Sequence, residues 1–219
     1  RRKNGEVFPE WLSISAVRAT DGRVSHYVAS LSDISERKEA EQQIRHLAFY
    51  DPLTGLPNRR LLLDRLQQAM AHSAQTGQYG ALMFLDLDNF KNINDLYGHQ
   101  AGDQLLLQAA GRLSALVRSS EAVARLGGDE FVLMLEQLGG QADQAASRAE
   151  QLGGQILHSL SQPYSLLGQP LHSSVSIGVV LFLGNHESVD ELFKRADLSM
   201  YEAKHAGKNA LRFFDPQMQ

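Results

Sequence analysis

The stretch that decides the fold is AVARLGGDEFVLMLE, residues 122–136. Two short apolar runs, Ala122 to Leu126 and Phe131 to Glu136, flank a polar turn that begins with paired glycines. Paired glycines between two such runs predict a β-hairpin, because glycine adopts the positive φ values that tight turns require. A hairpin joins antiparallel strands, so the sheet that contains it cannot be wholly parallel.

Helix and strand patterns alternate on both sides of this hairpin. A helix is predicted to begin at Pro57-Asn58, and a nearly continuous apolar run at 79–87 predicts a buried strand. Further helices are expected at 101–118, at 141–160 and from a capping box at Ser188 to about His205, and further strands at 173–183 and 210–214. Gly153-Gly154 predicts an interruption of the helix at 141–160. The pattern indicates an α/β (α+β) domain with about five strands.

Residues 1–35 have a different sequence pattern. Alternating runs at 6–17 and 24–31 lie on either side of Asp21-Gly22, which predicts a second hairpin. Two strands alone are only marginally stable in water. This hairpin is therefore expected to end a larger domain or to be an accessory of the main one.

Residues 36–50 predict a charged connecting helix that Ser35 caps. Its apolar positions, Ala40, Ile44 and Leu47, are spaced by four and three residues and form a narrow stripe. Such a stripe suits pairing with a second copy of the helix, and it suits an edge helix of a monomer equally well.

Composition limits the classes of function. With 43% hydrophobic residues the chain can bury a core, and 21 basic against 25 acidic residues give no positive field for a nucleic acid. Cysteine is absent, which excludes disulfides and thiolate metal sites. No apolar run approaches the roughly 18 residues of a transmembrane helix. We expect a cytoplasmic fragment without membrane contact, cut from a longer protein whose upstream part could carry a membrane anchor.

Two acidic pairs stand at the ends of apolar strands. Asp86 and Asp88 point to the same face at the exit of the strand at 79–87, and Asp129-Glu130 lies in the hairpin turn. Carboxylates brought together repel one another unless a cation lies between them, and Mg²⁺ suits such oxygen ligands. Each pair could also be an ordinary set of turn residues.

Polar groups near these acids could bind a nucleotide. Asn94 and Asp103, in an expected loop at 89–103, offer an amide and a carboxylate that match a guanine edge. The glycines of the hairpin leave backbone N–H groups open to a phosphate. Single lysines serve as phosphate ligands but are more often solvated, and the candidates are Lys91, Lys204 and Lys208.

Taken together, these segments resemble the GGDEF family of diguanylate cyclases. The matching stretches follow the family's order and are DPLTGLPNRR (51–60), FLDLDNFKNINDLYGHQAGD (84–103), RLGGDEF (125–131), SIGVV (176–180) and ADLSMYEAKHAGKN (196–209). The resemblance implies a fold like the palm of polymerases and nucleotide cyclases, with a five-stranded, mostly antiparallel sheet flanked by helices. It also implies GTP as substrate, Mg²⁺ or Mn²⁺ as cofactor, and cyclic di-GMP as the product of two facing domains in a homodimer.

The resemblance carries roles over to particular residues. The metal-binding positions are Asp86, Asp129 and the carbonyl of Leu87, and the catalytic positions are Asp129 and Glu130. The substrate-binding positions are Phe90, Lys91, Asn94, Asp103, Gly127, Gly128, Lys204 and Lys208. The same residues would bind GTP in a regulatory domain with little cyclase activity, which would control an adjacent EAL phosphodiesterase. That alternative stays open.

A departure from the family concerns inhibition by product. Inhibited members carry Arg-x-x-Asp ahead of the hairpin, and this chain has Arg118-Ser-Ser-Glu121. Glutamate keeps the charge but is longer by one methylene, so cyclic di-GMP binding is predicted to be retained and weakened. Arg148 could support the same site.

The flanks resemble other signalling modules. Residues 1–35 look like the C-terminal end of a PAS domain, 36–50 like its exit helix, and 51–215 like the cyclase domain. The last residues, 216–219, are similar to the start of a linker to an EAL domain.

Overall fold

The computed structural model describes residue 5 and residues 7–18, 20–117 and 122–218 of the chain. The chain divides into two compact units, Arg1–Ala48 and Phe49–Gln219. Within the described part, no helix is both long and apolar enough to cross a membrane.

The N-terminal unit is built on the predicted hairpin. Strand β1 (Glu10–Arg18) pairs antiparallel with β2 (Val24–Asp33), and helix α1 (Ser35–Phe49) follows. Ser35 is the first helical residue rather than the cap, because its amide and hydroxyl both donate to the carboxylate of Asp33. Ile44 and Leu47 of the predicted stripe are 66% and 64% exposed, so no described part of the chain covers them.

The second unit contains a five-stranded sheet in the order β4-β5-β3-β8-β9. The strands are β3 (Gly80–Leu87), β4 (Ala122–Gly127), β5 (Glu130–Leu135), β8 (Val175–Phe182) and β9 (Leu211–Phe213). Every neighbouring pair is antiparallel except β8 and β9. The mostly antiparallel sheet predicted from the sequence is confirmed.

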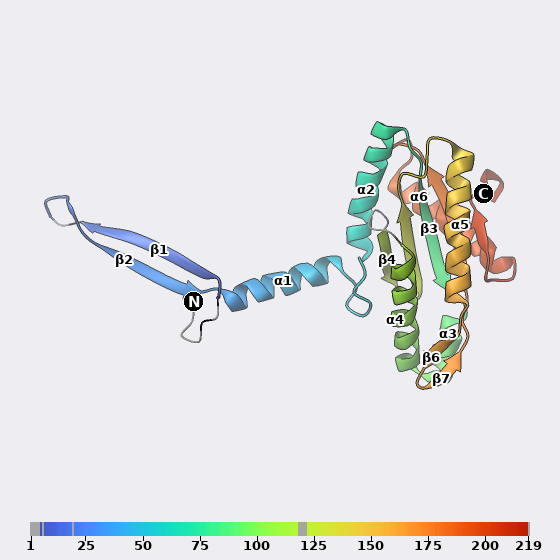
Figure 1. The fold of residues 1–219 in the computed structure, drawn as a ribbon, viewed down its shortest axis with the longest axis horizontal. Helices are drawn as coiled ribbons and strands as arrows, with labels where there is room; N and C mark the ends of the chain where they lie inside the picture. Colours follow the sequence, from blue (N-terminus) through green and yellow to red (C-terminus); the bar gives the residue numbers. More distant parts are fainter. Residues whose placement is uncertain (1–4, 6, 19, 118–121, 219) are drawn as a thin grey trace. The chain divides into compact units, whose positions relative to one another are not determined.

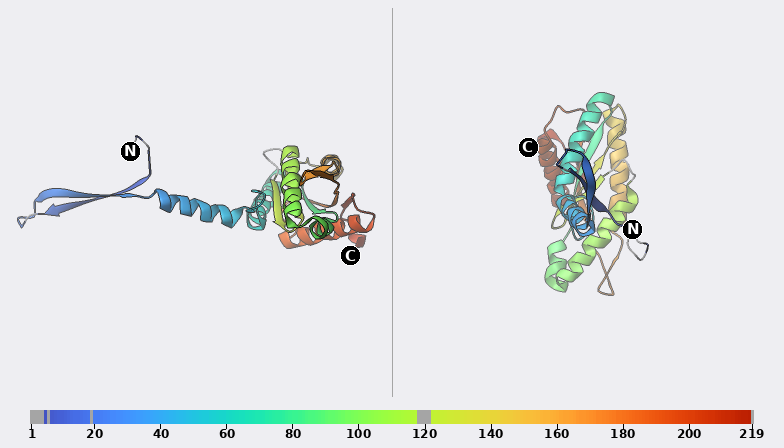
Figure 2. Two further views of the ribbon diagram at one scale, coloured as in Figure 1. Left: turned by 90° about the horizontal axis from the view of Figure 1, so that it is seen from below. Right: turned by 90° about the vertical axis from the view of Figure 1, so that its left-hand side faces the viewer.

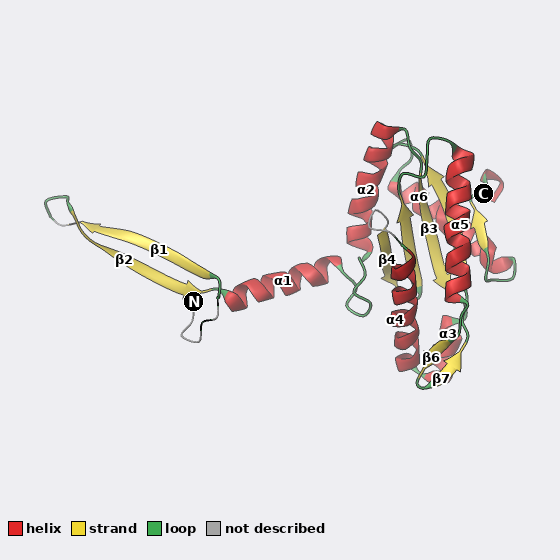
Figure 3. Ribbon diagram, viewed as in Figure 1, coloured by secondary structure: helices red, strands yellow, loops and turns green. Residues whose placement is uncertain are grey.

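Helices cover both faces of this sheet (Figures 1 and 2). The helices α2 (Arg59–Thr76) and α6 (Val189–His205) pack on one face, and α4 (His99–Leu116) and α5 (Ala142–Leu160) pack on the other. Strand β3 is buried along its whole length, and its side chains alternate between the two cores. Figure 3 shows the helices around the central strands.

Local sequence signals explain where two of the helices begin. The side chain of Asn58 accepts the amides of Arg60 and Leu61 at the start of α2. The hydroxyl of Ser188 accepts the amide of Glu191 at the start of α6. Both starts lie where the sequence predicts them, because an N-cap side chain satisfies amides that have no partner within the helix.

Three features differ from the sequence expectations. The expected loop at 89–103 is a helix, α3 (Phe90–Tyr97), followed directly by α4. A small hairpin of β6 (Tyr164–Leu166) and β7 (Gln169–Leu171) was not predicted. Helix α5 is continuous across its two glycines. Gly153 is buried, and a Cβ there would lie 2.0 Å from the side chain of Leu211 in β9, so this glycine allows the helix to pack closely. A short 3₁₀ turn (Pro216–Met218) ends the described chain.

Candidate functional site

Three acidic residues gather where β3 ends beside the β4–β5 hairpin. Asp86 of β3 lies directly opposite Glu130 of β5. Gly128 and Asp129 form the two-residue turn, with Gly128 at a φ of 51°, which favours glycine. The backbone amide of Leu87 donates to the carbonyl of Asp129 at 3.3 Å and ties the turn to β3.

The electrostatics of this cluster favour a cation. Burial raises the pKa of Asp86 to about 6, and the charges of Asp129 and Glu130 add to the effect. Burial and the charge of Asp129 also raise the pKa of Glu130. Lys204 of α6 opposes both shifts, and its ammonium lies 2.8 Å from the Asp86 carboxylate. The carboxylates outnumber this cation, so a further positive charge would stabilise their ionised forms.

The backbone of Leu87 presents a further oxygen to the hairpin. In a strand the N–H and C=O of one residue point to the same side, and the Leu87 amide points to Asp129. The next amide, of Asp88, points the other way and donates to the carbonyl of Ser174 at 2.8 Å. The Leu87 carbonyl is therefore directed toward the side of the sheet that carries Asp129.

These oxygens fit a divalent cation shared with a substrate. No group of three or more histidine or carboxylate side chains in the described residues could hold a metal by itself. Mg²⁺ is usually held by one or two carboxylates together with substrate phosphates. Asp86, Asp129 and the Leu87 carbonyl supply such an incomplete set of hard oxygen ligands.

Asp88 does not join this acidic cluster. Its side chain is 1% exposed, and both its oxygens are hydrogen-bonded. The donors are the hydroxyls of Ser174 and Ser176, at 2.5 and 2.7 Å, and the amide of Asn209, at 3.1 Å. Of the first acidic pair in the sequence, Asp86 thus faces the cluster and Asp88 faces the interior.

The predicted base-reading residues lie where α3 meets α4. Asn94 of α3 packs so closely on Gly102 of α4 that a Cβ there would lie 2.0 Å from its Oδ1. Asp103 follows Gly102 and is exposed on α4. The glycine therefore brings the amide and the carboxylate into neighbouring positions. Phe90, at the start of α3, packs partly buried against the core.

The three candidate lysines differ in their surroundings. Lys204 pairs with Asp86, as described above. Lys208 has a φ of 66°, unusual for lysine, and its ammonium donates to the side chain of Asn89 at 2.7 Å. Lys91 is exposed on α3. Lys204 and Lys208 thus contact residues at and just beyond the end of β3, where the acidic cluster lies.

An ion pair that sequence reasoning missed supports the turn. The guanidinium of Arg125 contacts both carboxylate oxygens of Asp51, at 2.9 and 3.0 Å, and it also donates twice to the carbonyl of Gly128. The two side chains are only 10% and 15% exposed. Both residues stand in motifs singled out above, but a contact across 74 positions leaves no local pattern.

The residues expected to bind product are only partly described. Arg118 and Glu121 lie outside the described residues, so product binding there stays a prediction. Arg148 is exposed on α5 and donates to the carbonyl of Gln137 at 3.3 Å.

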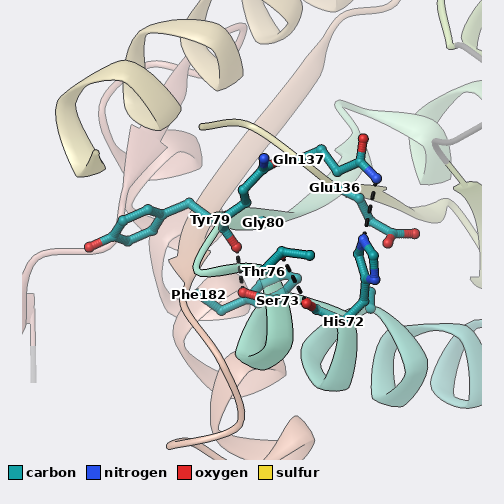
Figure 4. Close-up of a pocket in the computed structure, with 10 residues that line it drawn as sticks. His72, Ser73, Thr76, Tyr79, Gly80, Glu136, Gln137 and Phe182 are labelled. Carbon is teal, nitrogen blue, oxygen red and sulfur yellow. Dashed lines mark hydrogen bonds between the residues drawn. The ribbon is translucent and has the colours of Figure 1, made fainter. Parts of the chain in front are cut away.

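A small cavity lies at the opposite end of β3 (Figure 4). It is lined by His72 and Ser73 of α2, by Gly80 at the start of β3 and by Glu136 beyond β5. Its volume of about 10 Å³ is room for about one water molecule. The cavity is therefore too small for a nucleotide.

Comparison with known proteins agrees with this geometry. The sequence model of the family described as "Diguanylate cyclase, GGDEF domain" matches residues 48–210. The chain belongs to the GGDEF family. Its match includes the acidic cluster and the strands β3, β4, β5 and β8, and it ends just before β9.

Several GGDEF relatives are curated proteins. The bifunctional diguanylate cyclase/cyclic di-GMP phosphodiesterase MucR of Pseudomonas aeruginosa is 43% identical over 82% of this chain and 25% of its own length. The diguanylate cyclase DgcM of Escherichia coli is 41% identical over 81% of this chain and 41% of its own. The cyclic di-GMP phosphodiesterase PdeR of Escherichia coli is 34% identical over 87% of this chain and 28% of its own length. The chain thus spans less than half the length of these relatives.

Solved GGDEF structures share the fold. The GGDEF domain of TpbB (YfiN) from Pseudomonas aeruginosa is 34% identical with a TM-score of 0.72, covering 77% of this chain and 96% of that one. The coiled coil and GGDEF domain of DgcB from Caulobacter crescentus, in complex with c-di-GMP, is 28% identical with a TM-score of 0.73. The match covers 82% of this chain and 93% of that one.

Proposed function

We propose that this GGDEF domain is an active, metal-dependent diguanylate cyclase that condenses two GTP molecules into cyclic di-GMP and two pyrophosphates. The observation that carries the proposal is the gathering of Asp86, Asp129 and Glu130 at the end of β3 beside the β4–β5 turn, with Lys204 next to Asp86. Such a surplus of carboxylates suits a cation that arrives with a triphosphate.

Each group of the site would have a distinct role. Asp86, Asp129 and the Leu87 carbonyl would hold Mg²⁺ or Mn²⁺, which, when bound, polarises the α-phosphate and acidifies the attacking 3′-hydroxyl. Glu130, whose pKa is raised, would accept the proton of that hydroxyl. The lysines would hold the phosphates, with Phe90 and the glycines of the turn lining the nucleotide. Asn94 and Asp103 would read the guanine.

Condensation needs two domains. One site binds one GTP, and each 3′-hydroxyl must attack the α-phosphate of the other nucleotide in line. Two copies facing each other would bring both pairs of reacting atoms together, so the rate depends on their mutual orientation.

The test is a turnover assay with Mg²⁺ and GTP that follows pyrophosphate and cyclic di-GMP. Asp129→Ala should lower the rate by a factor of about 100 or more, since it removes a metal ligand and charge at the reacting centre. Asp64→Asn, an exposed acid on α2, is the matched control and should leave the rate unchanged. Unaltered turnover and metal dependence in Asp129→Ala would exclude the proposed site.

A second candidate is a GTP-binding regulatory domain that controls an adjacent phosphodiesterase. It is favoured by the similarity to PdeR and MucR, whose names include that activity. Measurable GTP binding without pyrophosphate release, in the full-length parent protein, would support this candidate and exclude the first.

A further inference from the structure

Asp88 is a buried carboxylate that the proposed reaction does not use. Its three donors come from β8, from the segment before it and from the segment after α6. Its backbone is also fixed, because the hydroxyl of Ser173 donates to the Asp88 carbonyl at 3.0 Å. Asp88 therefore joins the exit of β3 to two segments that lie far away in the sequence.

The segment after α6 has an unusual backbone. Lys208 and Asn209 have φ values of 66° and 45°, in the left-handed region that side chains other than glycine rarely adopt. Such a conformation persists only where surrounding contacts enforce it. The amide of Asn209 donates to Asp88, and the amide of Lys208 donates to the carbonyl of Ala203 in α6. Asp88 thus holds one side of the strained turn.

The strained turn determines where Lys208 lies. Its ammonium reaches back to Asn89, the residue after Asp88, at 2.7 Å. The lysine is therefore placed beside the exit of β3, two residues beyond the end of the strand. The amide of Asn209 ties the left-handed turn to Asp88, while the amide of Lys208 ties it to α6.

We propose that Asp88 is a positioning residue that holds the Lys208–Asn209 turn so that Lys208 meets the triphosphate of GTP. This inference rests on the proposed function only for the identity of the nucleotide. Asp88 itself touches neither nucleotide nor metal. It acts through Lys208, so its effect should disappear when Lys208 is absent.

A double-mutant cycle tests this dependence. The probe is 3′-deoxyGTP with Mg²⁺, which lacks the attacking hydroxyl, and its Kd for the whole chain is measured by calorimetry. Asp88→Ala and Lys208→Ala should each weaken binding about tenfold, as expected for one charge-assisted contact. The double variant should bind within about twofold of Lys208→Ala. Asp64→Ala, on the exposed face of α2, is the control and should bind like the unaltered chain.

Two results would overturn the inference. The first is unaltered binding in Asp88→Ala, and the second is a double variant weakened by the product of the two single losses, about 100-fold. If Asp88→Ala does not fold, Ser174→Ala replaces it in the cycle, because it removes one donor to the same Asp88 oxygen that Asn209 contacts. Ser174→Ala alone should weaken binding of 3′-deoxyGTP about threefold. If it weakens binding by the same factor in a chain that already carries Lys208→Ala, the inference is contradicted.

The assay separates this inference from the proposed cyclase activity, because binding of 3′-deoxyGTP requires no turnover. If the losses of 3′-deoxyGTP binding in the two single variants are coupled but the chain does not turn over GTP, Asp88 keeps its positioning role and cyclase activity is excluded. If the losses are independent and the chain makes cyclic di-GMP, the positioning role is excluded and the cyclase activity stands.

Discussion

At the scale of single residues, Asp86 lies in an environment that opposes its charge. Folding raises its pKa from 3.8 to about 6, so the folded chain holds this proton more tightly than the unfolded chain does. The resulting stabilisation is present in full below about pH 4 and is lost as the pH rises through 6. Above that pH the ionised side chain destabilises the metal-free fold.

Asp86→Asn should therefore stabilise the metal-free protein at pH 8 and have a much smaller effect at pH 5. Thermal unfolding in the presence of a chelator at the two pH values measures this. Added Mg²⁺ and 3′-deoxyGTP should stabilise the unaltered chain and not the variant, because the ligand binds only the intact folded site. Equal effects at both pH values would contradict the assigned burial of the carboxylate.

The Arg125–Asp51 pair gives a second prediction at this scale. Arg125→Lys should lower the free energy of unfolding of the second unit by about 1–2 kcal/mol, because lysine cannot contact both oxygens of the part-buried Asp51 carboxylate and the Gly128 carbonyl together. Urea unfolding measures the change. Arg212→Lys, at an exposed position on β9, should change it by less than about 0.5 kcal/mol.

The candidate site residues could be proposed from the sequence because their motifs resemble a family. The contacts that these residues make with distant segments could not be predicted from the sequence. Asp86 and Asp88 look equivalent by strand alternation, yet Asp88 is enclosed by donors from residues 174, 176 and 209. The partner of Arg125 is equally remote. Local patterns predict which face a side chain takes, and they do not identify the distant segment that meets it.

At the scale of elements, helix α6 approaches β8 closely enough to require glycine. A Cβ at Gly178 would lie 2.0 Å from the carbonyl oxygen of Ala196 and 2.3 Å from the amide of Met200. One turn further along α6, Lys204 reaches Asp86. The spacing of this helix from the sheet thus determines whether the lysine meets the acidic cluster.

Gly178→Ala should lower the free energy of unfolding by about 1–3 kcal/mol, because backbone atoms of α6 would have to move. It should also weaken binding of 3′-deoxyGTP by displacing Lys204. Gly154→Ala is the matched control, since its Cβ would meet nothing within 4 Å, and it should stabilise α5 by about 0.5–1 kcal/mol. A stabilised Gly178→Ala would contradict the close packing.

The five strands and most helices could be predicted from apolar runs and capping residues. Helix α3 could not, because its many Asn, Asp and Lys residues suggest a loop. A signal was nevertheless present, since Phe90, Ile93 and Tyr97 are spaced by three and four residues. The β6–β7 hairpin is held by side chains of α4, including two hydrogen bonds between Gln108 and Ser165. Its three-residue strands carry too little pattern of their own.

At the scale of the whole molecule, activity should depend on association of two copies. The exposed stripe of α1, Ile44 and Leu47, is the surface that would pair in a connecting helix. The PAS and EAL assignments of the flanks remain predictions.

Leu47→Glu should lower turnover at low protein concentration and leave the Kd for 3′-deoxyGTP unchanged, because it weakens association and not the site. Turnover per chain should recover as protein concentration rises. Gln43→Glu, another exposed position on α1, is the control and should behave like the unaltered chain. If Leu47→Glu has the same turnover at every concentration, α1 is an edge helix that does not pair.

The long-range contacts at the exit of β3 have a consequence for biosynthesis. Asp88 receives its last hydrogen bond from a residue 121 positions later. At roughly 5–20 residues per second, a ribosome takes about 6–24 s to supply it. The signature hairpin leaves the ribosome well before Lys204 and Asn209 do. A nascent or truncated chain can therefore carry the complete family signature while its nucleotide site is still incomplete, because the site also needs the residues up to Asn209.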